Sequence, residues 1–365
     1  MKFLTGFLSI LILYACTAYA GTTAETISPT AEVFFTKNIT PAGIEACFDR
    51  IKGDRIKGTV AFKVHFGEEG NENWLKPALI QTLVEKLKAT FIETNVLYGG
   101  ERGSTDSHIA LAKKHGFGFA PIEIVDSEKT LEIKVEGLRH FAKFATGAGI
   151  AKYDTIIVYS HFKGHSSAGF GGAVKNIAMG LAGREGKYAM HSLNIPAINQ
   201  SRCVKCGLCA AACPGGAITI TPEIRIDPKK CLGCGKCIGI CTSEVYSPLP
   251  DSEKQNAFLE KLAEYAYAIS RGRNMLYINV LANISPQCDC LSRAKKPFTG
   301  DIGVLASTDP IALDQASLDL VDKACHSPDA FKEHSGASGT HMLEYAESIG
   351  MGMRKYHLVN LDTEK

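Results

Sequence analysis

The chain has 365 residues, with 40 Lys plus Arg, 38 Asp plus Glu and a formal net charge of +2. This length exceeds what one hydrophobic core usually organises, so we expect a principal domain and at least one smaller unit. The near-neutral charge gives no long-range field that would hold nucleic acid or an anionic membrane surface. The 13 cysteines are clustered, which indicates metal binding and not a disulfide framework.

Residues 1–20 have the pattern of a secretory leader, because Lys2 precedes a long run of apolar and small residues. Small residues before Gly21 suit ordinary signal cleavage, whereas a lipobox-like sequence would leave Cys16 lipidated. An uncleaved anchor is a third reading, since the uncharged run is long enough to cross a bilayer. We therefore expect an exported protein, periplasmic or attached to the membrane through the leader or Cys16. It would be cytoplasmic if the leader is not used.

Apolar strand patterns alternate with amphipathic helical patterns in residues 21–195 and again in 249–365. The expected strands are Val33–Lys37, Thr59–Phe66, Thr90–Leu97, Ile122–Val125, Leu131–Val135, Thr155–Ser160, Met275–Ala282, Ile302–Ala306 and His357–Leu361. The expected helices are Pro41–Ile51, Leu75–Leu87, His108–His115, Gly172–Leu181, Ser252–Ile269, Pro310–Ala324 and His341–Ser348. This alternation predicts one α/β host domain with a mainly parallel sheet, interrupted by residues 196–248.

A strand, a glycine-rich loop and a helix follow one another near residue 160. Backbone amides of such a loop, together with a helix N-terminus, can hold an anion. The residues predicted to do so are Gly171, Gly172, Lys175 and Asn176. The alternative is a glycine turn that only lets the helix pack on the sheet.

Histidines follow two of the predicted strands. The carboxyl ends of parallel strands share one edge of a sheet, so groups after them should face one cleft. The candidate catalytic residues, which would bind or protonate a small anionic substrate there, are His65, His161, Lys163 and His165. A hydrogen-bonded structural histidine is the alternative at each position.

Two cysteine runs repeat the spacing C-x-x-C-x-x-C-x-x-x-C. In this spacing three thiolates surround one cubane, while the fourth cysteine reaches the other cubane. One 4Fe–4S cluster is therefore assigned to Cys203, Cys206, Cys209 and Cys241. The other is assigned to Cys231, Cys234, Cys237 and Cys213. Zinc also binds paired C-x-x-C units, but it has no need for two identical four-cysteine runs.

Residues 196–248 are thus predicted to be an inserted α+β dicluster ferredoxin domain of the bacterial type. A further pair, Cys288 and Cys290, follows the strand that ends near Ala282 and should border the cleft. These thiols could ligate an additional metal, accept electrons from a cluster or act as nucleophiles. Structural thiols are the alternative.

Together these motifs resemble the uncharacterised iron–sulfur-centre proteins in which the domain of unknown function 362 is joined to a dicluster ferredoxin. The resemblance is carried by both cysteine runs and by Lys63–Glu68, Ser160–His165, Gly171–Asn176, Ile284–Cys290 and Ser307–Pro310. It implies a 4Fe–4S protein whose α/β host domain has an unsettled activity.

Two functions are compatible with this pattern. In the first, the protein is a redox enzyme, an oxidoreductase whose two clusters relay electrons to a site in the host domain. In the second, it is a non-catalytic electron carrier or redox-sensing module that docks a partner protein. We favour the first, because a carrier needs only the cluster segment, whereas this chain has many further residues with polar groups at strand ends.

Overall fold

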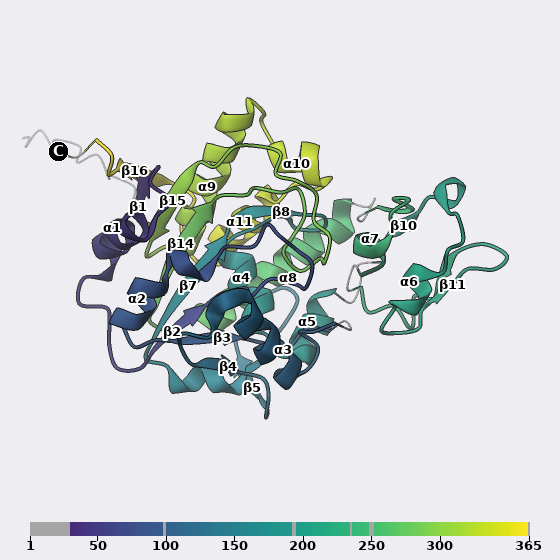
Figure 1. The fold of residues 1–365 in the computed structure, drawn as a ribbon, viewed down its shortest axis with the longest axis horizontal. Coiled ribbons are helices and arrows are strands. Elements are labelled where there is room, and N and C mark those ends of the chain that lie inside the picture. The colour runs from purple at the N-terminus through teal and green to yellow at the C-terminus, as the bar shows by residue number, and fades with distance from the viewer. Residues whose placement is uncertain (1–29, 98–99, 192–194, 234–235, 248–251, 364–365) are drawn as a thin grey trace, which may run out of the picture.

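The computed structural model describes residues 30–363 apart from 98–99, 192–194, 234–235 and 248–251 (Figure 1). Its centre is an eight-stranded sheet in the order β16-β1-β15-β14-β7-β2-β3-β4. The strands are β1 (Ala31–Thr36), β2 (Val60–Lys63), β3 (Thr90–Glu93), β4 (Ile122–Ile124), β7 (Thr155–His161), β14 (Met275–Leu281), β15 (Gly303–Ser307) and β16 (Tyr356–Asn360). Only β15 is antiparallel to its neighbours within this sheet. The predicted α/β domain with a mainly parallel sheet is therefore confirmed.

The central strands are buried on both faces. Along β7, Ile156 and Val158 belong to one buried apolar cluster, whereas Ile157 and Tyr159 belong to another. This alternation follows the two-residue period of a strand. A sheet with two apolar faces needs a helical layer on each side.

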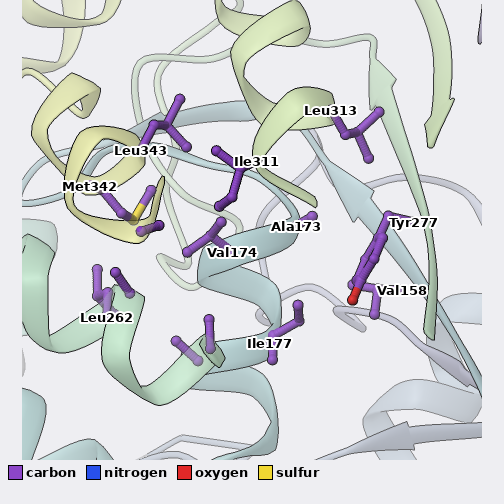
Figure 2. Packing of buried hydrophobic residues seen from close by; sticks show 14 of the residues in the cluster. Val158, Ala173, Val174, Ile177, Leu262, Tyr277, Ile311, Leu313, Met342 and Leu343 are labelled. Atoms are coloured by element: carbon purple, nitrogen blue, oxygen red, sulfur yellow. The ribbon is translucent and has the colours of Figure 1, made fainter. Parts of the chain in front are cut away.

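The helices on one face of the sheet are α4 (Ala173–Leu181), α5 (Arg184–His191), α8 (Ser252–Ser270), α9 (Pro310–Cys325), α10 (Ala330–Ser335) and α11 (Thr340–Ser348). Apolar residues of α4, α8, α9 and α11 join the first cluster and cover this face. Figure 2 shows Val174 and Ile177 of α4 packed among Leu262, Ile311 and Met342. Fully burying one such aliphatic side chain contributes roughly 1.5–3 kcal/mol.

The opposite face is covered by the N-terminal helices α1 (Pro41–Lys52), α2 (Gln81–Lys86) and α3 (Thr105–Ala112). Cys47 of α1 is fully buried in this second cluster. The predicted start of a helix at Pro310 is confirmed, and the Asp309 carboxylate caps it by accepting the amide hydrogens of Ile311 and Ala312 at 2.8 and 3.0 Å.

Two predicted elements differ from the structure. The predicted strand Leu131–Val135 corresponds to β5 (Thr130–Lys134), which pairs with β6 (Lys143–Gly147) in a separate two-stranded sheet. Its charged alternate residues suit a strand with one solvated face. The predicted helix Leu75–Leu87 is divided into a 3₁₀ turn that starts at Pro77 and the short α2. Proline lacks an amide hydrogen, so a helix cannot continue through it without losing a hydrogen bond.

The glycine-rich loop predicted after β7 is a small antiparallel hairpin, formed by β8 (Lys163–His165) and β9 (Gly169–Gly171). Gly169 has a φ of +76°. A Cβ atom there would lie 2.2 Å from the backbone nitrogen of Gly339. Only glycine suits this position, because the conformation is left-handed and the space is closed.

The cysteine-rich segment projects from one side of the α/β body (Figure 1). Its short strands are β10 (Ala197–Ile198), β11 (Ile218–Thr219), β12 (Arg225–Ile226) and β13 (Tyr246–Ser247), and its helices are α6 (Leu208–Ala211) and α7 (Lys236–Ile240). β10 pairs with β13, and β11 pairs with β12, both antiparallel. Ile218, Ile224, Val245 and Cys209 form a separate small apolar cluster within the segment.

The predicted leader, with Cys16, lies outside the described residues, as does Cys234 of the second cysteine run. Within the part of the chain that the structure describes, no helix is both long enough and apolar enough to cross a bilayer.

Candidate functional site

A cavity of about 130 Å³ lies where β2, β3 and β7 end. The predicted residues that line it are His65, His161, Lys163, His165, Gly171, Gly172, Lys175, Asn176, Cys288 and Cys290. The expectation that the loops after β2 and β7 share one cleft is therefore confirmed. It rested on the common direction of parallel strands, and β2 and β7 are indeed adjacent and parallel.

The charge around this cavity is predominantly positive. The basic side chains that line it are Lys63, Arg102, Lys163, Lys175 and Lys187. Among the described lining residues Glu93 is the only carboxylate, and it lies 3.0 Å from the Lys63 ammonium. Burial lowers the pKa of Lys187 to about 8. A site with this excess of cations favours an anion.

The His161 side chain is buried and bonded to the protein through both ring nitrogens. Its Nδ1 lies 2.8 Å from the Asp289 carboxylate, and its Nε2 lies 2.6 Å from the carbonyl oxygen of Ala282. Both ring nitrogens are therefore engaged by the protein and neither is left for a substrate. Burial alone would raise the pKa of Asp289, but His161 and Lys163 outweigh it and hold that pKa below its usual range. This geometry favours a positioning role for His161 over the predicted catalytic role.

His65 is likewise committed to the protein. The Arg102 guanidinium approaches its Nε2 at 2.9 Å, and the Gly67 amide donates to its Nδ1 at 3.0 Å. Burial, followed by the charge of Arg102, holds the pKa of His65 well below its ordinary value. Both ring nitrogens therefore lie against groups of the protein and neither is left for a substrate, so this geometry does not favour the predicted protonating role of His65.

The predicted anion loop also requires correction. The amides of Ala173 and Val174, at the start of α4, donate to the Asp314 carboxylate at 2.8 and 2.9 Å. This carboxylate from α9 takes the place that an anionic ligand would need. Asn176 is used as well, since it accepts from Lys63 at 2.7 Å and donates to Ser160 at 3.0 Å.

Cys288 and Cys290 line the cavity and are not joined by a disulfide. One ligand atom of His165 and the two Sγ atoms lie within 4.8 Å of one another. The Lys175 ammonium lies 3.9 Å from the Cys288 Sγ. Histidine and cysteine are the ligands of zinc and iron sites, so this group has the composition of a metal site.

The protonation of this group favours one thiolate beside one thiol. A hydrogen bond from the Cys290 thiol, helped by Lys175 and Lys163 and opposed by burial, holds the pKa of Cys288 well below its ordinary value. The same hydrogen bond, with burial, raises the pKa of Cys290 well above its ordinary value. Burial, followed by Lys175, keeps the pKa of His165 low, and its Nδ1 accepts the amide hydrogens of Ser167 and Ala168 at 3.2 and 3.1 Å.

In the projecting segment, Cys213, Cys231 and Cys237 line one small pocket. Amide groups approach the sulfur atoms in a repeated pattern. Ala217 donates to Cys213 at 3.3 Å, and Val245 donates to Cys241 at 3.5 Å, each four residues after the last cysteine of its run. The two runs therefore share local backbone geometry as well as spacing.

The projecting segment reaches the main cavity through Gly233, which lies in the second cysteine run and lines that cavity. The His191 ring of α5, another lining residue, donates to the backbone of Gly233.

A protein-family profile described as "Domain of unknown function (DUF362)" matches residues 60–319. The chain belongs to the DUF362 family. The match extends from β2 into α9 and includes both the cavity and the cysteine runs. No curated protein matches the chain. The expected resemblance is thus confirmed for the DUF362 domain.

Several lining residues of this DUF362 domain were not among the predicted site residues, namely Lys63, Glu93, Arg102, Lys187 and His191. Lys63 and Glu93 end the neighbouring strands β2 and β3, each directly after apolar residues. A charged residue in an otherwise apolar buried strand needs a partner, and this signal was available in the sequence. Lys187 and His191 belong to α5, which no apolar pattern indicated.

Proposed function

We propose that the protein is an oxidoreductase that binds two 4Fe–4S clusters in residues 196–248 and reduces a small anion in the cavity of its α/β domain. The observation that carries this proposal is the position of Gly233. It belongs to the second cysteine run and lines the same cavity as Lys175 and Cys288. When bound, the clusters would supply electrons one at a time.

The described cysteines fit the proposed cluster ligands. Cys213 shares a pocket with Cys231 and Cys237, although it belongs to the other run in sequence. This supports an exchange of the fourth ligand between the two runs. Amide hydrogens aimed at Cys213 and Cys241 favour thiolates over thiols.

The backbone of the first run also suits a cluster. Lys205 and Gly207 have φ values of 55° and 81°, and a non-glycine residue rarely adopts such a value without a local reason. Alternation of this kind turns successive amides toward one point, as in anion-binding nests. An anionic cluster with its thiolates is a ligand that such a loop would accept.

The cavity suits a small anionic substrate for two reasons. Its volume of about 130 Å³ limits the size of the group that is bound. Lys163 stays charged, because Asp289 and Cys288 raise its pKa although burial opposes the charge. In this proposal Lys163 and Lys175 bind the anion, while His161 and Asp289 hold the loop that carries the cysteines.

A redox partner protein would deliver electrons at the outer end of the projecting segment. Val204 and Leu208 flank Cys206 there and are 70% and 48% exposed. Exposed apolar side chains beside an exposed proposed ligand suit transient docking. The same observation favours the second candidate function, an electron carrier without catalysis.

Reoxidation of the reduced protein separates the two functions. The full chain is purified anaerobically, reduced with dithionite, freed of excess reductant and mixed with a panel of small carboxylate, phosphate and disulfide anions. The absorbance of the clusters reports electron loss. We expect at least one anion to reoxidise the wild type, and the Lys175→Met variant to react about tenfold more slowly because it loses a charge at the site.

Lys134→Met, which removes an exposed lysine of β5, is the matched control and should behave like the wild type. If no anion reoxidises the clusters but a ferredoxin or flavodoxin does, the carrier function replaces the enzyme.

A further inference from the structure

The loop that contains Cys288 and Cys290 is fixed on several sides. Between the two cysteines, the Asp289 carboxylate bonds His161 at 2.8 Å and lies 3.5 Å from the Lys163 ammonium. The carbonyl oxygen of Asp289 accepts the amide hydrogen of Glu68 at 2.9 Å.

The following residue of this loop is held in the same way. The Asn71 side chain donates to the carbonyl oxygen of Leu291 at 2.8 Å. These contacts fix the backbone, so the positions of the two thiols are set by the fold and not by a ligand.

The anchoring of Asp289 sets the direction of the two cysteines on either side of it. Its carboxylate points to His161, whereas Cys288 and Cys290 on either side of it both line the cavity. Two thiols that are one residue apart thus meet at one site, next to a lysine and a neutral histidine.

The surroundings of the pair distinguish a reactive dithiol from a metal site. The Lys175 ammonium lies 3.9 Å from the Cys288 Sγ and would repel a cation bound there. The Nδ1 of His165 accepts two amide hydrogens, so its proton belongs on Nε2, which cannot then ligate a metal.

The surroundings of Cys288 do not match those of a structural thiol either. A structural buried thiol has a raised pKa and is inert. Cys47 is an example, because burial raises its pKa to about 12. Cys288 has the opposite shift although it is buried, because it accepts hydrogen bonds and lies beside lysines. Thiolates next to lysine are the reactive ones in thiol–disulfide chemistry.

We propose that Cys288 and Cys290 form a redox-active pair that exchanges with a small anionic disulfide bound in the cavity. The Cys288 thiolate attacks one substrate sulfur. A mixed disulfide forms, the substrate S–S bond breaks, and the other half leaves as a thiolate that takes up a proton. The Cys290 thiol then loses its proton and attacks the Cys288 sulfur, which releases the second half and forms the Cys288–Cys290 disulfide.

This exchange converts one small disulfide, the Cys288 thiolate, the Cys290 thiol and one proton from solvent into two small thiols and one protein disulfide. Two electrons and one proton then restore the thiolate–thiol pair, and for the supply of these electrons the inference rests on the proposed function. The pair would thereby convert single-electron delivery into a two-electron reduction. In this exchange Lys175 has two roles, because its charge stabilises the Cys288 thiolate and also attracts the anionic substrate.

Trapping of the mixed disulfide tests the inference. The anaerobic full chain carrying Cys290→Ser is mixed with dithiodipropionate, which is anionic, or with bis-hydroxyethyl disulfide, which is neutral. Peptide mass spectrometry follows. We expect an adduct on Cys288, because no second thiol is present to resolve it. The wild type should instead show a Cys288–Cys290 disulfide, and Cys288→Ser should show neither product.

The anionic probe should react faster than the neutral one. Lys175→Met should slow the anionic probe about tenfold, because it removes the cation that attracts the anion and stabilises the thiolate. Lys134→Met is again the control. An adduct on Cys290 but not Cys288, no adduct at all, or equal rates for the two probes would overturn the inference, as would stoichiometric zinc that is lost in Cys288→Ser.

Thiol exchange needs no iron, so this result is independent of the proposed function. Iron is measured on the same sample. Trapping without iron would refute the proposed function and leave the reactive pair, whereas intact iron without trapping would refute the pair alone.

Discussion

The buried ion pair between Lys63 and Glu93 joins two strand ends beneath the cavity, and its two side chains are 0% and 4% exposed. Lys63→Met keeps most of the aliphatic stem but leaves Glu93 buried without its counter-charge. Loss of one partner of a buried pair costs about 3–5 kcal/mol. Lys63 also donates to the carbonyl oxygen of Val64 at 2.6 Å and to Asn176 at 2.7 Å, and each bond contributes about 1 kcal/mol.

Unfolding in urea measures this cost. Trp74 is the single tryptophan and is buried next to the loop after β2, so its fluorescence reports on this region. The double variant Lys63→Met/Glu93→Leu should recover most of the loss, because no charge is then left unpaired. Lys52→Met, at the exposed pair with Asp49, is the control and should cost about 1 kcal/mol or less. A loss below about 1 kcal/mol for Lys63→Met would refute the reasoning.

Three further results are expected. Cys213→Ala should remove the paramagnetic signal of the cluster that Cys231 holds, and loss of the other cluster would reverse the ligand assignment. Iodoacetamide at neutral pH should label Cys288 long before Cys47, and comparable labelling rates would contradict the thiolate. His161 and Lys163 hold the pKa of Asp289 low despite burial, so its contribution to stability is present above about pH 4 and lost as the pH falls further. The difference in unfolding free energy between the wild type and Asp289→Asn should therefore shrink below about pH 4, and a constant difference would be inconsistent with the ion pair.

The meeting of His65, His161 and Cys288 was predictable from the sequence, because strand direction alone decides which ends share an edge. The orientation of the ring nitrogens was not predictable. Whether His161 faces the cavity or Asp289 depends on side-chain packing between segments that are distant in sequence. The carboxylate of Asp314 at the start of α4 is a contact of the same kind, and it excluded the predicted anion there.

Cysteine spacing carried more information than any other pattern. It predicted that Cys213 would lie with Cys231 and not with the rest of its own run, and both line one pocket. The shared pocket agrees with this spacing, while the assignment of the cysteines to two cubanes stays a prediction. In contrast, β5 was assigned to the wrong sheet, since a short strand pattern does not specify its partner.

Metal analysis of the anaerobically purified full chain tests the central claim most directly. Two complete cubane ligand sets predict about eight irons and eight acid-labile sulfides per chain. Stoichiometric zinc without iron would contradict the account.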